Sequence, residues 1–368
     1  MDVDPGQPLW NVPGLLSLHI VRSHRFGPSF AQRASPVKMH FFGGVTPRSS
    51  VDRWEELVED LVQTWRLDWS YAVMVDELIG DDKKGSGLVD TVIPLVINTH
   101  GWTRGYGAEL QKRLESMAEP THIFTLTDPN SRDSEPAERL EPDQSLALQY
   151  TLEPLPSSPL SSRFTANDLR SISILSYFHM IPTAKKNDSQ SAPTILWNTS
   201  KALCDMPPWQ VSYGRDKAIK RVYLTGPWTD DVVPSEIDRV MDCAIVALME
   251  VDDDAISSLP DNAQSSIPYI QGDKAPQAKH TKCLGLALIR AVDPSKESFH
   301  VLTPLDVSSL ANCHVVIKGE LSLPVWGFLR FGEAPAADAP YLDWGMTRGV
   351  RGGEKKRIRR NLMRKGQM

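Results

Sequence analysis

The sequence predicts an α/β domain with a parallel sheet, followed by a β-rich second domain. A length of 368 residues suggests two domains rather than one. In the first half, continuous apolar runs alternate with helical apolar spacing, which is typical of a parallel sheet with crossover helices. From about residue 215 onward, the apolar segments are short and separated by turns, which is typical of a sandwich or barrel.

The first predicted elements precede and include one long helix. Met1–Gln7 reads as the end of a buried strand that runs into a loop. Residues 11–36 are punctuated by Pro and Gly and predict irregular structure. Apolar residues spaced three and four apart predict a helix from about Asp52 to Arg66, and the mixed segment 67–75 allows a short strand.

A strand–helix–strand unit comes next. The run 91–97 is continuously apolar, which predicts a strand buried on both faces. A glycine-rich loop, 98–107, leads into a helix through Leu110 and Leu114, and 122–126 predicts another buried strand. Two strands joined by one helix through short loops predict parallel strands of one sheet.

The composition then changes twice. Residues 128–162 contain six prolines with many serines and acidic residues, which predicts a disordered insertion. A helix is expected over 167–180 and a loop over 185–193. Short β segments follow at 221–224, 244–250, 284–292, 299–302, 314–317 and 325–331. The predicted division is therefore a domain over 1–200, a β-rich domain over 205–345 and a basic tail over 346–368.

Charge and composition narrow the function classes. Nine of the 40 basic residues but only one of the 46 acidic residues lie in the tail, so the remainder carries 31 basic and 45 acidic residues. An acidic body with a basic tail often contacts nucleic acid or an acidic partner, but composition alone favours a nuclear-import signal or a solvated terminus. No apolar run reaches the roughly 20 residues of a membrane helix, so no membrane association is expected. The four cysteines form no Cys-x-x-Cys pair, which favours a reducing intracellular compartment over a zinc or disulfide scaffold.

Two loops at predicted strand ends carry residues with chemical potential. Asp4, in Asp4-Pro-Gly-Gln7, could hold Mg²⁺ or accept a proton, although Asp-Pro-Gly is also a common turn. In the loop 98–107, Trp102 offers a flat ring for a nucleic-acid base and Arg104 can meet phosphate; alternatively, the ring packs into the core. The phosphate-binding motif Gly-x-x-x-x-Gly-Lys-Ser/Thr does not occur in the sequence.

Seven segments in sequence order resemble the polynucleotide 5′-hydroxyl-kinases, specifically the fungal rRNA-processing branch. They are Asp2-Val-Asp-Pro-Gly-Gln7, Pro13-Gly-Leu-Leu-Ser-Leu18, Gly27-Pro28, His40-Phe-Phe-Gly-Gly-Val-Thr-Pro47, Pro94-Leu-Val-Ile-Asn-Thr-His-Gly-Trp102, Leu175-Ser-Tyr-Phe-His179 and Arg359-Arg-Asn-Leu-Met-Arg-Lys365.

The resemblance implies a P-loop kinase-like parallel sheet and a β-rich C-terminal domain. It implies transfer of the γ-phosphoryl group of ATP to an RNA 5′-hydroxyl, with Mg²⁺. Asp4 is similar to the aspartate that positions Mg²⁺ and activates the hydroxyl, with Asp2 second to it, and Gln7 lies in the same cofactor-binding segment. The RNA end would meet Thr46 and Pro47 and a clasp made of Thr99, Gly101 and Trp102. Arg163 and Arg170 are the nearest candidates for a basic lid that stabilises the transferring phosphoryl group.

The sequence departs from this family at its start. In the family, a further domain and the phosphate-binding loop precede the Asp-Pro-Gly-Gln segment, so we expect the first strands and that loop to be missing here and the chain to be inactive alone. The main expectation is a nucleolar kinase that phosphorylates pre-rRNA 5′-hydroxyl ends, left in the internal spacer by a partner endoribonuclease. The alternative is a non-catalytic RNA-binding or scaffold subunit of the same nuclease complex.

Overall fold

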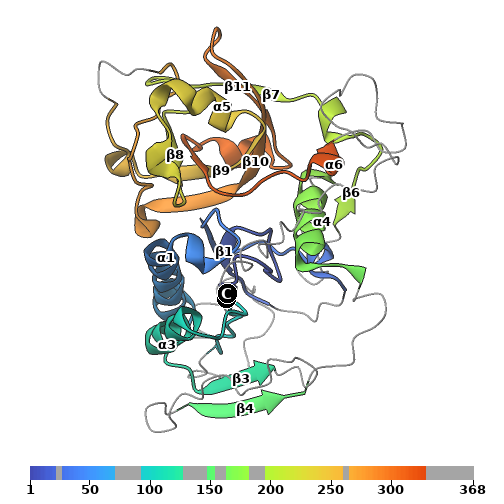
Figure 1. Ribbon diagram of the computed structural model, residues 1–368, viewed down its shortest axis with the longest axis vertical. Coiled ribbons are helices and arrows are strands. Elements are labelled where there is room, and N and C mark those ends of the chain that lie inside the picture. The colour runs from blue at the N-terminus through green and yellow to red at the C-terminus, as the bar shows by residue number, and fades with distance from the viewer. Residues whose placement is uncertain are drawn as a thin grey trace, which may run out of the picture.

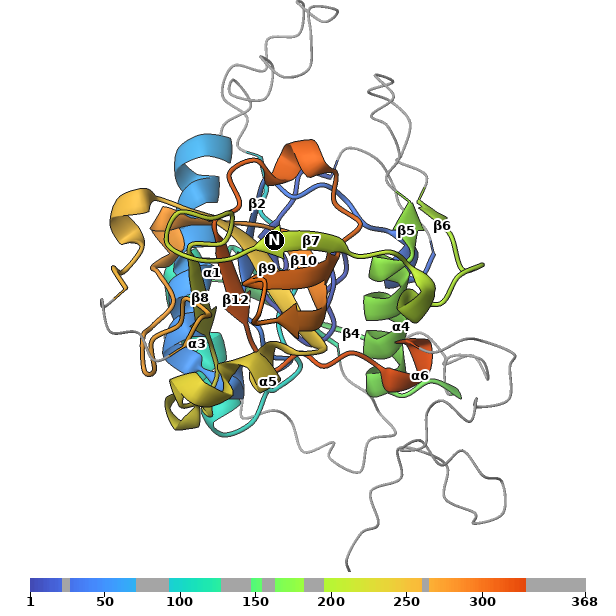
Figure 2. The same cartoon turned by 90° about the horizontal axis from the view of Figure 1, so that it is seen from above.

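The computed structural model describes residues 1–21, 27–70, 93–126, 147–153, 163–181, 195–259 and 265–328. A large sheet forms one end of the molecule and a two-stranded sheet forms the other, with the N-terminal segment between them (Figure 1). Helices α1 and α4 lie on opposite sides of that segment in both views (Figures 1 and 2). In the described part of the chain, no helix is long and apolar enough to cross a membrane.

The large sheet has six strands in the order β7-β11-β10-β9-β12-β8. All neighbours are antiparallel except β12 and β8, which are parallel. The bounds are Trp209–Ser212 for β7, Arg221–Leu224 for β8, Ala244–Val251 for β9, Thr281–Asp293 for β10, Ser298–Leu302 for β11 and Val315–Lys318 for β12. The short helix α5 (Ile237–Met241) packs on one face through a cluster of buried side chains that includes Ile237, Tyr213 and Phe299.

The N-terminal segment is a small sheet covered by helices. Strands β1 (Leu15–Leu18) and β2 (Lys38–Phe41) pair antiparallel, and Asp2 bridges to Ser17 on one side and, in parallel, to Asn98 on the other. Helices α1 (Val51–Thr64) and α3 (Tyr106–Ala118) share a buried cluster with this sheet. Its members include Val3, Leu16, Trp54, Leu61 and Leu110, so the predicted buried segment at Met1–Gln7 is confirmed as far as Val3.

Helix α4 (Ala166–Phe178) joins the N-terminal segment to the large sheet. Tyr177 donates from its hydroxyl to the Leu286 carbonyl oxygen at 3.1 Å and accepts from the Leu286 amide at 2.8 Å. This contact lies at a bulge in β10, where a Cβ on Gly285 would be 2.7 Å from the Tyr177 hydroxyl. One buried cluster accordingly contains Leu15, Phe41 and Leu175 together with Ile245 and Leu288, across the predicted division near residue 200.

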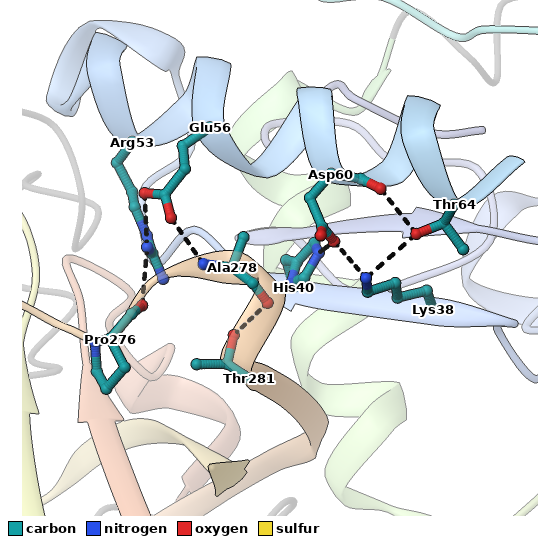
Figure 3. A network of polar contacts seen from close by, with 9 residues as sticks. All are labelled: Lys38, His40, Arg53, Glu56, Asp60, Thr64, Pro276, Ala278 and Thr281. Atoms are coloured by element: carbon teal, nitrogen blue, oxygen red, sulfur yellow. Dashed lines mark hydrogen bonds and ion pairs between the residues drawn. The ribbon is translucent and has the colours of Figure 1, made fainter. Parts of the chain in front are cut away.

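Helix α1 is tied to two neighbours by polar contacts (Figure 3). On the β2 side, Asp60 contacts the buried His40 ring at 2.6 Å and the Lys38 ammonium at 2.5 Å. On the side of the large sheet, Arg53 donates to the Pro276 carbonyl oxygen at 3.0 Å, and Glu56 accepts from the Ala278 amide at 2.6 Å. The helix therefore connects the N-terminal sheet to the segment that enters β10.

The three long helices predicted from apolar spacing are confirmed, as are five of the β segments. The predicted strand over 325–331 is wrong in its described part, where Val325–Phe328 form the short helix α6. The tentative strand after α1 begins instead as a π-helix, Trp65–Trp69, and the rest of it lies outside the described residues. Residues 11–36 are not wholly irregular because they contain β1, and β2 and β7 carried no prediction.

The predicted parallel sheet of the first half is only partly present. Residues 93–97 form no strand, and the Val96 side chain is 78% exposed. Strand β3 (His122–Leu126) exists but is exposed, and it pairs in parallel with β4 (Leu148–Leu152) instead of with the segment before α3. An apolar run shows that a segment can be buried but does not identify its partner, which is why the prediction failed here. β4 also contradicts disorder for part of 128–162; residues 128–146 and 154–162 lie outside the described residues, as does the predicted loop 185–193.

Candidate functional site

Two extended segments that pair in parallel position the candidate site. The Val3 amide donates to the Asn98 carbonyl oxygen at 3.0 Å, and the Asn98 amide donates to the Met1 carbonyl oxygen at 3.0 Å. Because this pairing is parallel, Asp4 and Thr99 leave the same edge. Side chains at the carboxyl ends of parallel strands are well placed to meet a ligand.

Asp2 and Asp4 have different surroundings. Asp2 is fully buried and accepts from the Leu9 and Trp10 amides and from the Asn98 side-chain amide, at 2.6, 3.4 and 2.9 Å. Burial raises the pKa of Asp2. These contacts use Asp2 to hold the turn after the strand.

Asp4 is half-buried, and one carboxylate oxygen accepts from the Gly6 amide at 2.8 Å. That bond belongs to a turn, and no other hydrogen bond or ion pair joins Asp4 to the described residues. The second carboxylate oxygen thus remains available for a ligand, so the turn and the ligand interpretations of Asp4 are compatible.

The loop 43–48 lies against this turn. A Cβ on Gly6 would be 2.6 Å from the Val45 carbonyl oxygen, so the two backbones are in contact. Thr46 is half-buried and begins a short 3₁₀ turn that holds the buried Pro47 and the exposed Arg48. The structure therefore brings Thr46 and Pro47 beside Asp4.

Helix α3 holds the clasp segment from the other side. Gln111 donates to the His100 carbonyl oxygen at 3.0 Å and to the Thr99 hydroxyl at 3.4 Å. Gly101 is exposed, with no atom within 4 Å of the position that a Cβ would take. The Gln111 side chain thus holds Thr99 and the His100 backbone, and the position next to Gly101 is open.

Trp102 has contacts both in the core and at the surface. It is half-buried and packs against the N-terminal cluster, so close to Gly107 that a Cβ there would be 2.4 Å from the indole. The Arg48 guanidinium lies over the same ring, 4.1 Å from its centroid. The ring is therefore part core and part surface, and a cation covers part of it.

Two residues of this site received no role from the sequence. Arg48 could have been suspected because it directly follows the quoted Thr46-Pro47 segment. His100 is buried between Trp54 and Trp102, at 5.4 and 6.4 Å between ring centroids. Its Nδ1 accepts from the Trp102 amide at 3.3 Å, which leaves the proton of the neutral ring on Nε2.

The Nε2 atom of His100 has no hydrogen-bond partner among the described residues. Burial lowers the pKa of His100, and the charge of Asp4 acts in the opposite direction. A buried donor without a partner is costly, and such groups are common at functional sites. His100 therefore adds an unused hydrogen-bond donor beside Asp4.

The remaining predicted site residues are not brought together with Asp4. Arg170 donates within α4, to the Ala166 carbonyl oxygen at 3.1 Å, and Arg163 is exposed just before that helix. No contact between described residues joins either arginine to Asp4. Gln7 is exposed at the end of the turn.

The donor set near Asp4 fits a magnesium ion carried by a nucleotide. Mg²⁺ is usually bound through one or two carboxylates, with phosphate and water completing its shell. The available oxygen of Asp4 could supply one such ligand, and the described residues contain no cluster of three His, Cys, Asp or Glu that would hold a metal by itself. ATP phosphates would have to supply further ligands.

Comparisons with known proteins show what the chain is similar to. Residues 1–180 match the family model described as the mRNA cleavage and polyadenylation factor CLP1 P-loop. The polynucleotide 5′-hydroxyl-kinase GRC3 of Cryptococcus neoformans var. neoformans is 30% identical over 404 aligned residues, which cover 100% of this chain and 52% of that protein. The chain is a homologue of the polynucleotide 5′-hydroxyl-kinases.

Two further relatives of this kinase family extend the comparison. Polynucleotide 5′-hydroxyl-kinase grc3 of Schizosaccharomyces pombe is 25% identical, with 99% of this chain and 50% of that protein covered. The NOL9 kinase of Danio rerio is 24% identical, with 100% and 47% covered. A chain in a solved Clp1p–Pcf11p complex has 15% identity and a TM-score of 0.46 over 88% of this chain and 66% of that chain. The chain thus spans about half the length of the GRC3 and NOL9 relatives.

Proposed function

We propose that this chain is the RNA-binding and β-rich part of an ATP-dependent polynucleotide 5′-hydroxyl-kinase. One observation carries the proposal: Asp4, the loop 43–48 and the segment 99–102 converge on one edge of the N-terminal sheet. These three segments supply a carboxylate, a cation and an aromatic ring. That set suits a 5′-terminal nucleotide whose hydroxyl must lose a proton.

Each residue of the candidate site has a separate role in this proposal. Trp102 and Arg48 bind the first nucleotide, through stacking and through charge. Asp4 accepts the proton of the 5′-hydroxyl as that oxygen bonds to the phosphorus. MgATP, when bound, would supply the γ-phosphoryl group, whose bond to the bridging oxygen of the β-phosphate would break and leave ADP. The Nε2–H group of His100 offers a hydrogen-bond donor on the side of the site where Asp4 lies.

The biological setting follows from the family resemblance. We propose that the substrate is a pre-rRNA end made in the internal spacer by a partner endoribonuclease, and that the protein works in the nucleolus. Three curated relatives named polynucleotide 5′-hydroxyl-kinase support the reaction class. The scaffold alternative is favoured by one observation, which is that the 368 residues contain no Gly-x-x-x-x-Gly-Lys-Ser/Thr motif.

Two measurements test the proposal. The first compares binding of the chain to a short RNA with a 5′-hydroxyl and to the same RNA with a 5′-phosphate; the kinase function predicts tighter binding of the hydroxyl form. The second sequences the 5′ end of the transcript. An upstream in-frame phosphate-binding motif would support the kinase, whereas a start at Met1 together with equal binding of the two RNAs would favour the scaffold.

A further inference from the structure

A second cation–tryptophan pair lies at the end of strand β12. The Lys318 ammonium is 5.3 Å from the centroid of the Trp228 ring and donates to the Gly319 carbonyl oxygen at 2.9 Å. Both side chains are half-buried, and no carboxylate among the described residues forms an ion pair with Lys318. The acidic residue whose charge acts on Lys318 is Glu320, which is exposed; a Cβ on Gly44 would be 3.0 Å from one of its carboxylate oxygens.

This pair adjoins the base of the loop 43–48. The amides of Glu320 and Leu321 both donate to the Gly43 carbonyl oxygen, at 2.8 and 3.1 Å. A Cβ on Gly319 would be 2.5 Å from the Gly43 Cα, so the two backbones cross in direct contact. Lys318, at the end of β12 in the large sheet, therefore lies near the first residue of the loop 43–48. Arg48 lies at the other end of that loop.

The energetics of Lys318 favour an anionic ligand. Burial lowers the pKa of this lysine, which means that desolvating its ammonium group costs free energy. A carbonyl oxygen, an indole face and the charge of Glu320, which forms no ion pair with Lys318, offset only part of that cost. A phosphate would supply the missing charge, and the Trp228 ring beside it could contact a base.

We propose that Lys318 and Trp228 bind the RNA strand downstream of its 5′-terminal nucleotide, Lys318 through a backbone phosphate and Trp228 through a base. This inference rests on the proposed function, in which the first nucleotide lies at Arg48 and Trp102. The RNA would then run along the loop 43–48 from the Arg48–Trp102 pair to the Lys318–Trp228 pair. An RNA long enough to reach the second pair would bind more tightly than a shorter one. The same phosphate chemistry could come from ATP, and the test separates the two sources.

The test measures binding of the full 368-residue chain to ATP and, at several salt concentrations, to two 3′-fluorescein-labelled RNAs with 5′-hydroxyl ends, a trinucleotide and a decanucleotide. Lys318→Gln should weaken decanucleotide binding roughly 3- to 10-fold and lower the slope of log Kd against log salt by about 0.7, since one phosphate contact is lost. Trinucleotide binding should be unchanged. Lys318→Arg keeps the charge and should bind as the wild type does.

Lys282→Gln is the matched control. Lys282 lies on β10 of the same sheet, but it is 67% exposed and lies 3.6 Å from a carboxylate oxygen of Glu250. This change removes one charge from the same sheet without touching the pair, so it should leave both RNA affinities within twofold. If Lys318→Gln fails to fold, Lys318→Met replaces it, because Met keeps an apolar stem against Trp228.

The outcomes separate this inference from the function on which it rests. If Lys318→Gln binds both RNAs with wild-type affinity and salt slope while Trp102→Ala loses affinity, the downstream site is refuted and the first-nucleotide site stands. If Lys318→Gln weakens ATP binding and not RNA binding, the ligand is the nucleotide and the inference fails. If the wild-type chain binds neither RNA, both the inference and the proposed function fail.

Discussion

The guanidinium carbon of Arg48 lies 4.1 Å from the centroid of the Trp102 ring. The two residues come from segments on opposite sides of the Asp4 turn, so this contact closes the candidate site on one side. The indole also packs against Gly107. The ring is thus held in place before any RNA arrives, which lowers the entropic cost of stacking a base on it.

Replacement of Trp102 should affect both RNA binding and stability. Trp102→Ala should weaken binding of a 5′-hydroxyl RNA by about 1–3 kcal/mol, the usual value of a base–aromatic stack. Because the ring is only half-buried, unfolding should be easier by less than the about 3–5 kcal/mol expected for a core tryptophan. The core reference is Trp54→Ala, since Trp54 is fully buried. Equal stability losses for the two variants, with RNA affinity intact, would assign Trp102 to the core alone.

Asp4 can be tested in a protein that contains this chain together with a phosphate-binding loop. Asp4→Asn keeps an oxygen that accepts from the Gly6 amide but removes the charge. The phosphorylation rate should fall on the order of 100-fold or more, because positioned bases contribute 10²–10⁴-fold. RNA affinity and melting temperature should stay near wild type. An unchanged phosphorylation rate would show that Asp4 serves only to stabilise the turn.

The 368-residue chain should not phosphorylate RNA by itself. Backbone amides and a lysine of the phosphate-binding loop make most phosphate contacts in P-loop enzymes, and that motif does not occur in this sequence. Incubation of the pure chain with γ-labelled ATP and a 5′-hydroxyl RNA should yield no labelled RNA, and ATP binding should be weak. Labelled product that survives purification to homogeneity would contradict this prediction.

Sequence reasoning succeeded where the signal was local. The spacing of Trp54, Leu57 and Leu61 predicted α1. The quoted motif segments also contained Asp4, Thr46 and Trp102, whose roles in binding and catalysis stay predictions. It failed where the partner of an apolar run decides the structure: the Val96 side chain and the strand with Phe124 remain exposed. Lys318 could not be found either, because its relation to the loop 43–48 depends on a contact between residues far apart in the chain.

The buried His40 makes stability depend on pH. Burial lowers the pKa of His40 below its ordinary value of 6.5, despite the opposite effect of Asp60. Between the folded and the unfolded pKa of His40, the unfolded chain therefore binds more protons than the folded chain. The stability that the neutral His40 contributes is fully present above pH 6.5 and is lost as the pH falls below that value. His40→Gln should reduce the change in melting temperature between pH 7 and pH 5, whereas replacement of the exposed His122 should leave that change as in the wild type. A pH dependence identical to wild type in His40→Gln would show that other groups cause it.

Two glycines of the candidate site should respond in opposite ways to alanine. Gly319→Ala places a methyl group 2.5 Å from the Gly43 Cα, and such overpacking typically costs about 1–3 kcal/mol. Gly101→Ala meets open space, so its melting temperature should stay within about a degree of wild type, while RNA affinity should fall if the RNA approaches that backbone. Thermal unfolding of both variants and RNA titration of Gly101→Ala check these expectations. A wild-type melting temperature for Gly319→Ala would show that the two backbones can move apart at little cost in free energy.

The crossing of Gly43 and Gly319 also limits how the molecule can move. Two backbones in direct contact, joined by hydrogen bonds from residues 320 and 321 to the Gly43 carbonyl oxygen, leave little room for sliding or for a hinge between the large sheet and the loop that carries Thr46. A rotation of the sheet would therefore displace that loop in the same direction. Any protein that docks on the outer strands and tilts the sheet would in this way shift the proposed site of the RNA end, without approaching it.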